Sequence, residues 1–241
     1  MNLPATKMHY QIEPIGIVRS PYKEKFAVPR QPGLVPSARS EIVLQGEANA
    51  IEAVRGLEQF SHLWLLFLFD QNLEAGWRPT VRPPRLGGNE RIGVFASRAT
   101  FRPNGIGMSA VELIGVRQQG ADVIIELGGV DLVDGTPIVD IKPYIPYSDS
   151  LPHANGGFAD GEPTTLPVVF SAKAEGQFKG KQLARQRAVI TEVLAQDPRP
   201  AYKKGKQDSK EYAVHLFDYN VKFTVANDVV TVTALDKPLA K

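Results

Sequence analysis

Short hydrophobic runs, separated by turns rich in proline and glycine, fill the first two thirds of the chain. The longest run, residues 62–69, is largely aromatic and aliphatic, which is typical of a strand buried on both faces. Residues 109–116 and 123–127 predict a hairpin around a polar turn at 118–120. Shorter elements are expected as strands at 10–17, 41–44, 92–95 and 138–141, and as a short helix at 48–55. This pattern favours a mainly β fold, a barrel or a sandwich, over alternating strands and helices.

The pattern changes after residues 148–163, which are small, polar and turn-forming. Residues 180–196 predict an amphipathic helix whose apolar side includes Ile190 and Leu194. Strands are expected on either side of this helix, at 166–172 and then, as a meander, at 212–217, 221–225 and 229–233. We therefore expect three segments: a β domain at residues 1–150, a linker at 151–163 and a smaller C-terminal α+β domain at 164–241.

Several classes of site are excluded by what the sequence lacks. The chain has no cysteine, which rules out thiolate nucleophiles, cysteine zinc sites, iron–sulfur clusters and disulfides. Its four histidines do not have the i,i+4 spacing of a helical zinc site, so no metal is expected. Neither a Gly-x-Ser-x-Gly elbow, a Walker A loop nor the glycine-rich loop of a dinucleotide-binding fold is present. The longest apolar run is too short to span a bilayer and no secretory signal pattern is present, so we expect a cytoplasmic protein without membrane association.

Charge is distributed unevenly, although the formal net charge is only +2. Residues 78–102 contain six arginines and one acidic residue, and residues 173–210 contain ten lysines or arginines and four acidic residues. Patches of this kind suit a polyanionic partner, because each neutralised phosphate releases counterions. The alternative for each patch is an ordinary solvated surface.

Residues 98–109 are the most informative segment, because arginines and glycines are concentrated in it. Gly105 and Gly107 are able to take positive φ, and successive N–H groups in such a turn form an anion-binding nest. Arg98 and Arg102 add charged donors for a carboxylate or phosphate. The alternative is a strand-to-strand turn with two surface arginines.

Two other loops carry polar side chains at positions typical of a binding site. In residues 19–33, Pro32 and Gly33 predict a type II turn, and Gln31 can donate to and accept from an adenine or ribose. Asp70 and Gln71 follow the buried run directly, where the chain leaves the core. Both loops have a structural alternative, as a surface loop and as a strand-ending turn.

The remaining candidate segments carry arginines or aspartates. Residues 77–88 interleave Arg82 and Arg85 with prolines, which keep the segment extended and the guanidinium groups outward. Residues 131–134, Asp-Leu-Val-Asp, offer carboxylates that bind an ammonium or accept a proton, or else form a plain hairpin turn. Asp140, Lys142 and Tyr144 alternate and would share one face of a strand.

Together these segments suit S-adenosylmethionine, which combines a carboxylate, an ammonium, a sulfonium and an adenine. Nucleoside triphosphates and other zwitterions share several of these groups, so this ligand is not singled out by the chemistry alone.

Six ordered motifs resemble the TsaA-like (YaeB-type, TrmO) β-barrel methyltransferases. They are Arg19-Ser-Pro-Tyr-Lys, Phe60-Ser-His-Leu-Trp64, Arg102-Pro-Asn-Gly-Ile-Gly-Met-Ser109, Asp131-Leu-Val-Asp-Gly-Thr-Pro137, Asp140-Ile-Lys-Pro-Tyr144 and Ala195-Gln-Asp-Pro-Arg-Pro-Ala-Tyr-Lys-Lys-Gly205. The resemblance covers nearly the whole chain. It implies a closed β-barrel that binds S-adenosylmethionine, works as a homodimer, and methylates N6 of threonylcarbamoyladenosine, the purine at position 37 of tRNA next to the anticodon.

The resemblance also implies roles for individual residues. The cofactor would be bound by Gln31, Pro32, Gly33, Asp70, Gln71, Arg98, Met108, Asp131, Leu132, Val133 and Asp134. Asp134 or Asp131 is a candidate general base, and Asn104 is expected to orient the carbamoyl group. The anticodon stem-loop of tRNA would be bound, largely through the C-terminal domain, by Arg82, Arg85, Lys142, Tyr144, Arg199, Lys203, Lys204 and Lys206. Two other functions stay open: a non-catalytic RNA-binding barrel, and a small-molecule methyltransferase or sensor.

Overall fold

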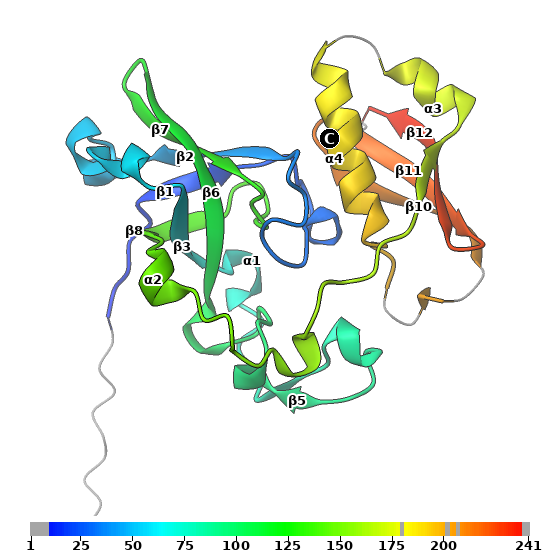
Figure 1. The fold of residues 1–241 in the computed structure, drawn as a ribbon, viewed down its shortest axis with the longest axis horizontal. Helices are drawn as coiled ribbons and strands as arrows, with labels where there is room; N and C mark the ends of the chain where they lie inside the picture. Colours follow the sequence, from blue (N-terminus) through cyan, green and yellow to red (C-terminus); the bar gives the residue numbers. More distant parts are fainter. Residues whose placement is uncertain (1–9, 179–180, 201–202, 206–207, 238–241) are drawn as a thin grey trace, which may run out of the picture.

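The computed structural model describes residues 10–178, 181–200, 203–205 and 208–237. Figure 1 shows two bodies side by side, a barrel formed by the first part of the chain and a smaller sheet formed by the last part. Within these described ranges, no helix is long and apolar enough to cross a membrane.

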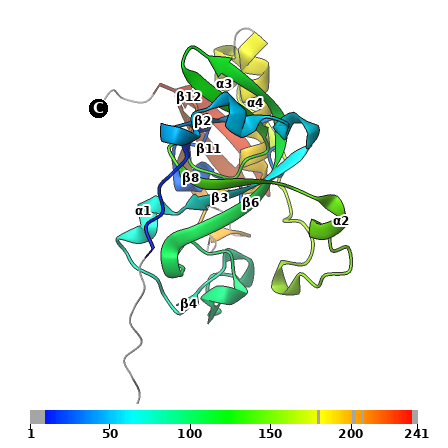
Figure 2. The ribbon, with the colours of Figure 1, turned by 90° about the vertical axis from the view of Figure 1, so that its left-hand side faces the viewer.

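The described barrel strands pair in the closed order β1-β2-β7-β6-β3-β8, and Figure 2 shows the barrel from the side. Their bounds are Gly16–Arg19 for β1, Arg39–Leu44 for β2, His62–Leu68 for β3, Ile106–Gln119 for β6, Asp122–Gly128 for β7 and Pro137–Pro143 for β8. All neighbours are antiparallel. The predicted hairpin of residues 109–127 is confirmed, and Gly120 takes a φ of 61° in its turn. The mainly β character expected from the sequence is therefore present.

Strand β3 differs from the prediction of a strand buried on both faces. Leu63, Leu65 and Phe67 point into the barrel core, whereas the residues between them are exposed or half-buried. The prediction was wrong because the apolar outer face of β3 contacts side chains from neighbouring segments and is not buried in a core. Trp64 packs 5.5 Å from the Tyr144 ring, centroid to centroid, and its indole N–H donates to Asp149, 2.8 Å away. A short helix, α2 (Pro146–Asp149), thus covers part of this outer face.

Short turns take the place of the predicted helix at residues 48–55. Ala50 and Arg55 have extended backbone and so interrupt any continuous helix. The loops between barrel strands contain η1 (Lys25–Ala27), η2 (Gly46–Ala48), η3 (Ile51–Val54), η4 (Leu57–Gln59), α1 (Asp70–Leu73), β4 (Thr80–Val81), η5 (Pro84–Leu86), β5 (Ile92–Gly93), η6 (Val94–Ala96) and η7 (Pro103–Gly105). Strand β5 pairs with β4 and is shorter than the strand predicted at 92–95. The strand expected at 10–17 likewise forms only from Gly16 onward.

The C-terminal part is a sheet covered by helices. Its strands run in the order β10-β11-β12-β9, with bounds Asp208–Leu216 for β10, Tyr219–Ala226 for β11, Val229–Asp236 for β12 and Val168–Phe170 for β9. The meander of β10, β11 and β12 is confirmed, and β9 adds a parallel edge strand. Helices α3 (Ala172–Gln177) and α4 (Lys181–Ala195) lie in the same region, and Ile190 and Leu194 on α4 are buried as predicted. Between the two bodies, residues 151–162 are exposed, and their one regular element is a single turn, η8 (Gly157–Ala159).

Residues 20–38 of the barrel pack into the core of the C-terminal sheet. Tyr22 and Val35 are fully buried in the same hydrophobic cluster as Leu194 and Leu216. Tyr22 also forms an isolated antiparallel bridge with Leu216, and the Ser37 hydroxyl donates to Glu192 on α4, 2.5 Å away. These contacts hold the first loop of the barrel against the second body, and this loop also lines the site described next.

Candidate active site

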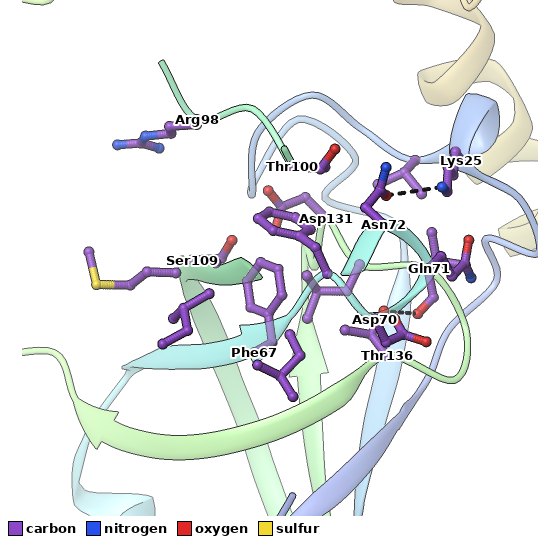
Figure 3. A pocket seen from close by; sticks show the side chains of 18 of the residues that line it. Lys25, Phe67, Asp70, Gln71, Asn72, Arg98, Thr100, Ser109, Asp131 and Thr136 are labelled. Carbon is purple, nitrogen blue, oxygen red and sulfur yellow. Dashed lines mark hydrogen bonds between the residues drawn. The ribbon is translucent and has the colours of Figure 1, made fainter. Parts of the chain in front are cut away.

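A cavity of about 420 Å³ lies where five segments meet: 25–31, 67–72, 97–102, 106–109 and 131–136. Strands β3 and β6 bring two of them together, because their antiparallel register pairs Phe67 with Gly107 and Leu66 with Met108. Figure 3 shows Asp131 among Phe67, Thr100 and Ser109 in the lining. The volume falls within the usual range for small-molecule sites, which is about 300–1,000 Å³.

Most of the residues expected to bind a cofactor line this cavity: Gln31, Asp70, Gln71, Arg98, Met108, Asp131, Leu132 and Val133. Pro32 and Gly33 do not belong to the lining. Gly33 has a φ of 81°, and its N–H donates to the carbonyl of Gly129, 2.8 Å away. The turn that these two residues form therefore holds Gln31 in place, and we find no direct ligand position for either.

Asp131 is the lining residue with the most unusual environment. Its carboxyl is buried, and Oδ1 has no hydrogen-bond partner within the described part of the chain. Burial raises the pKa of the Asp131 carboxyl to about 6, although the Ser109 hydroxyl and the charge of Arg98 act in the opposite direction. A carboxyl with a pKa near neutrality in a cavity is suited to proton transfer.

Arg98 lies at the exposed edge of the cavity (Figure 3), and its Nη1 donates to Oε1 of Gln31, 2.5 Å away. This contact joins two loops that are far apart in sequence. The guanidinium keeps further N–H donors for an anionic group, because Arg carries five in a planar fork.

Asp134 lies only three residues from Asp131 but outside the cavity lining. Its Oδ1 accepts from the Ser20 backbone N–H, 2.9 Å away, and its Oδ2 pairs with Lys23 Nζ at 2.8 Å. Its own backbone N–H donates to the carbonyl of Tyr22. The turn directs this carboxylate toward the first loop, so the expectation that Asp134 acts as cofactor ligand or base stays a prediction that these contacts do not support.

Asn104 also lies outside the lining, at an exposed position in η7. It takes a φ of 64° and Gly105 a φ of 61°, and the Gly105 N–H donates to the carbonyl of Arg102. Arg102 in turn donates to the carbonyl of Ser97, 2.8 Å away. These two donors are engaged within the turn, Arg102 also lines the cavity, and Asn104 is not among the lining residues.

Gly107 shows why glycine is needed in this segment. It does not have positive φ, contrary to the expectation. A Cβ on Gly107 would lie 2.3 Å from Cε2 of Phe67, so only glycine allows β6 to pass this close to the Phe67 ring. The sequence analysis missed other lining residues, among them Lys25, Arg30, Thr100, Ser109 and Thr136. Ser109 and Thr136 belong to quoted motifs, and Lys25, Arg30 and Thr100 lie in segments already singled out, but nothing in the sequence marked these particular side chains.

The residues expected to bind nucleic acid fall in two regions. Lys142 lies on β8, where it pairs with Asp140 at 3.0 Å, and Tyr144 follows directly after this strand; neither lines the cavity. Arg82 and Arg85 are exposed in the loop before β5, and Arg85 donates to the carbonyl of Gly161.

Arg199 is buried, with its Nε 2.8 Å from the carboxylate of Asp197, so its expected role as an RNA contact stays a prediction that this burial does not favour. Its side chain is only 1% exposed, so its guanidinium is not available to phosphates at the surface. Lys203 and Lys204 follow it in the chain, and Lys206 lies outside the described residues. In the ranges that the structure describes, no group of three acidic or histidine side chains could hold a metal ion.

Comparison with known proteins places this fold and cavity in a family of tRNA methyltransferases. Residues 17–150 match the profile of the tRNA-methyltransferase O N-terminal domain, and residues 163–238 match the TrmO C-terminal domain. The chain therefore belongs to the tRNA-methyltransferase O family.

Individual relatives agree with this assignment. A tRNA (adenine(37)-N6)-methyltransferase of Escherichia coli K12 is 57% identical over 230 residues, which cover 94% of this chain and 98% of that protein. A Pseudomonas aeruginosa PAO1 protein named as a putative S-adenosylmethionine-dependent methyltransferase is 50% identical over 217 residues, 89% of this chain and 92% of its own length. A crystal structure of TrmO from Pseudomonas aeruginosa superposes with a TM-score of 0.77 at 40% identity and covers 95% of this chain and 99% of its own.

Proposed function

We propose that the protein transfers a methyl group from S-adenosylmethionine to N6 of threonylcarbamoyladenosine at position 37 of tRNA, next to the anticodon. Membership in the tRNA-methyltransferase O family supports this reaction class. The observation that carries it is the buried Asp131 carboxyl, which lies in a cavity of small-molecule size and has one oxygen without a partner among the described residues.

The lining fits S-adenosylmethionine in chemistry. The Arg98 guanidinium suits the carboxylate of its amino-acid part, and the Gln31 and Gln71 amides suit an adenine or ribose edge. Phe67 and Phe69, whose rings meet edge to face 5.2 Å apart between centroids, supply apolar surface. When bound, this cofactor supplies an electrophilic methyl group on its sulfonium.

Asp131 is the residue that we assign to proton transfer. N6 of a carbamoylated adenine is a weak nucleophile, because its lone pair is delocalised into the ring and the carbonyl. As the new N–C bond forms, the N6 proton would pass to Asp131, whose pKa of about 6 leaves it largely ionised at neutral pH. The remaining rate enhancement comes from holding the two reacting groups in line.

We further propose the division of labour that the sequence predicts. The domain of residues 1–150 would bind the cofactor, and residues 164–241, joined to it by the linker at 151–163, would contribute to binding the tRNA. Exposed Arg82 and Arg85 and the cation of Lys204 support the nucleic-acid role. A homodimer is supported by exposed apolar side chains: Met108 in the cavity lining is 54% exposed, and Phe95 and Trp77 are 77% and 54% exposed. Such an enzyme would work in the cytoplasm, where tRNA is modified.

The decisive experiment is methyl transfer from radiolabelled S-adenosylmethionine to two tRNA pools. One pool comes from cells that make threonylcarbamoyladenosine, and the other from cells that cannot. We expect label in the first pool only. Label in both pools would show that the carbamoyl group is not required. Label in neither pool would rule out the proposed reaction. If the protein then still binds the cofactor, the result would point to a small-molecule methyltransferase or sensor. If it binds only RNA, the result would point to a non-catalytic RNA-binding barrel.

A further inference from the structure

A second cavity, of about 260 Å³, lies between the two bodies of the protein. Five residues of the first loop, between Lys25 and Arg30, form one wall, and Pro84 contributes from the arginine-rich loop. The other wall is formed by Val193, Gln196, Pro198, Arg199 and Pro200. Lys25, Val28, Pro29 and Arg30 line both this cavity and the candidate active site. The two cavities are therefore neighbours that share one loop as their common wall.

Arg30 in this shared wall is in direct contact with no acidic side chain among the described residues. It is half-buried, and among the described residues its guanidinium makes no hydrogen bond or ion pair. Asp197 is the acidic residue whose charge acts on Arg30. Both of its carboxylate oxygens already bind Arg199, at 2.8 and 3.0 Å. Partial burial, together with the neighbouring charge of Arg85, lowers the pKa of Arg30. A half-buried guanidinium in this setting is a natural partner for an incoming anion.

Lys204 adds a second cation beside this cavity, behind its lining residue Gln196. Its Nζ donates to the backbone carbonyl of Gln196, 3.2 Å away, on the wall of the second cavity. Burial and the charge of Arg30 both lower the pKa of Lys204, which shows that the two cations act on each other. No acidic side chain appears among the lining residues of this cavity. An anion would therefore relieve the repulsion between Arg30 and Lys204.

Two further groups favour a nucleotide over a simple anion. Gln196 is more than nine-tenths buried, and its Oε1 has no partner in the described ranges, while its Nε2 donates to the carbonyl of Glu192. An unpaired amide oxygen suits a donor such as a ribose 2′-hydroxyl. Phe26 in the lining is 68% exposed, so its ring is accessible for stacking with a base.

We propose that the second cavity is a ribonucleotide subsite for the nucleotide next to the methylated adenosine. In it, Arg30 and Lys204 bind the phosphate that joins the two nucleotides, Gln196 accepts from the 2′-hydroxyl, and Phe26 stacks on the base. Because Arg30 lies in the wall shared by the two cavities, a phosphate bound there would lie between the base in one cavity and the base in the other. The inference rests on the proposed tRNA substrate, but its test does not require methyl transfer.

The test measures binding of a fluorescent anticodon-arm RNA by anisotropy. In two forms of this RNA, a methylphosphonate removes the charge of one or the other phosphate flanking the target adenosine. With the unaltered protein, one of the two forms should bind roughly tenfold or more weakly, because a charge-assisted contact is lost. With Arg30→Gln, binding to native RNA should fall by a similar factor, and the methylphosphonate should cause a smaller loss than with the unaltered protein, because only Lys204 still contacts that phosphate. Equal losses from the methylphosphonate in both proteins would overturn the assignment.

Matched variants separate this subsite from general charge and from folding. Lys204→Gln should weaken binding and lower the slope of log affinity against log salt by about 1, whereas Lys173→Gln, an exposed lysine on α3, should change neither. Phe26→Ala should weaken binding several-fold, and Tyr147→Ala, an exposed aromatic outside both linings, should not. Thermal melting of each variant excludes unfolding as the cause. Equal losses for the test and control variants would contradict the subsite.

A 2′-deoxy substitution at the neighbouring nucleotide tests Gln196. The substitution should weaken binding to the unaltered protein and have no effect with Gln196→Leu. Failure of the proposed function is distinguishable: RNA binding that depends on Arg30, without methyl transfer to any tRNA pool, would remove the reaction and keep the subsite. Methyl transfer that is insensitive to either methylphosphonate would keep the reaction and remove the subsite.

Discussion

Nη1 of Arg98 lies 2.5 Å from Oε1 of Gln31, and this contact joins the first loop of the barrel to the segment before β6. The two loops form opposite parts of the same cavity, so the hydrogen bond sets its width at the exposed edge. Neither residue is held by the strands themselves. The geometry of the candidate cofactor site therefore depends on a contact between two loops, which makes Arg98 a sensitive position.

Replacing Arg98 by alanine should weaken cofactor binding strongly. The variant loses both the contact with Gln31 and a cation for the cofactor carboxylate, so we expect roughly a tenfold to hundredfold increase in the dissociation constant for S-adenosylmethionine. Because Arg98 is exposed, the melting temperature should change little. Calorimetric titration measures the affinity, with Arg91→Ala, exposed and outside the lining, as the control. An unchanged affinity in Arg98→Ala would show that the cofactor carboxylate binds elsewhere.

Asp131→Asn should remove the base while keeping the size of the side chain. We expect the rate of methyl transfer at saturating substrates to fall by about 10²–10⁴, the usual contribution of a general base. Cofactor affinity should be retained to within a few-fold. In the unaltered protein the rate should rise with pH and level off above about 6, following the pKa of Asp131. A rate that is flat between pH 5 and pH 7 would argue against this assignment.

Asp134→Asn is the informative comparison for Asp131. Asp134 pairs with Lys23 and accepts from the Ser20 backbone, outside the cavity. We expect a loss of stability of about 1 kcal/mol and methyl transfer near the level of the unaltered protein. Urea unfolding and the transfer assay together test this. A large loss of transfer without loss of stability would return the base to Asp134.

The stability of the protein should fall as pH rises between about 4 and 6 because of Asp131. Burial raises the pKa of the Asp131 carboxyl from 3.8 to about 6, so the folded chain holds this proton over a range where the unfolded chain has released it. The stabilising contribution of this proton to the free energy of unfolding is at most about 3 kcal/mol. It is fully present below the pKa of the unfolded chain and is lost as pH rises through the pKa of the folded chain. Urea unfolding at several pH values should show this loss in the unaltered protein and not in Asp131→Asn. Parallel curves for the two proteins would contradict it.

Gly107→Ala should distort the wall of the cavity. The added Cβ would lie 2.3 Å from Cε2 and 2.4 Å from Cζ of Phe67, and Phe67 is buried in the barrel core. We expect a loss of about 1–3 kcal/mol in stability and weaker cofactor binding, because the ring or the strand has to move. Gly93→Ala, where no atom lies within 4 Å of the new Cβ, is the control. Equal melting temperatures for the two variants would show that the ring moves at little cost.

Arg199→Ala should act mainly on stability, because this guanidinium is buried with Asp197. Removing one partner of a buried pair leaves the other charge without compensation, which typically costs about 3–5 kcal/mol. The expected result is a marked drop in melting temperature, in contrast to Lys204→Gln, which should melt nearly as the unaltered protein does. If Arg199→Ala melts normally but binds RNA poorly, the side chain contacts RNA after all.

Sequence alone determined those features that depend on neighbours along the chain. The hairpin of β6 and β7 and the buried face of α4 follow from side-chain periodicity, because residues two to four positions apart share a face. The loops that line the cavity were also identifiable, since Gln31, Asp70, Arg98 and Asp131 occur in short polar segments between apolar strands. The motif resemblance pointed to the same loops.

Tertiary structure decided which side chain of each loop enters the site. Asp131 and Asp134 belong to one turn and have similar local signals, yet one is buried in the cavity and the other pairs with Lys23. Arg199 and Lys204 belong to one basic segment, yet only Arg199 is buried with an aspartate. Burial, the direction of a turn and the pKa of a carboxyl depend on atoms contributed by strands and loops that are remote in sequence, so no local pattern determines them.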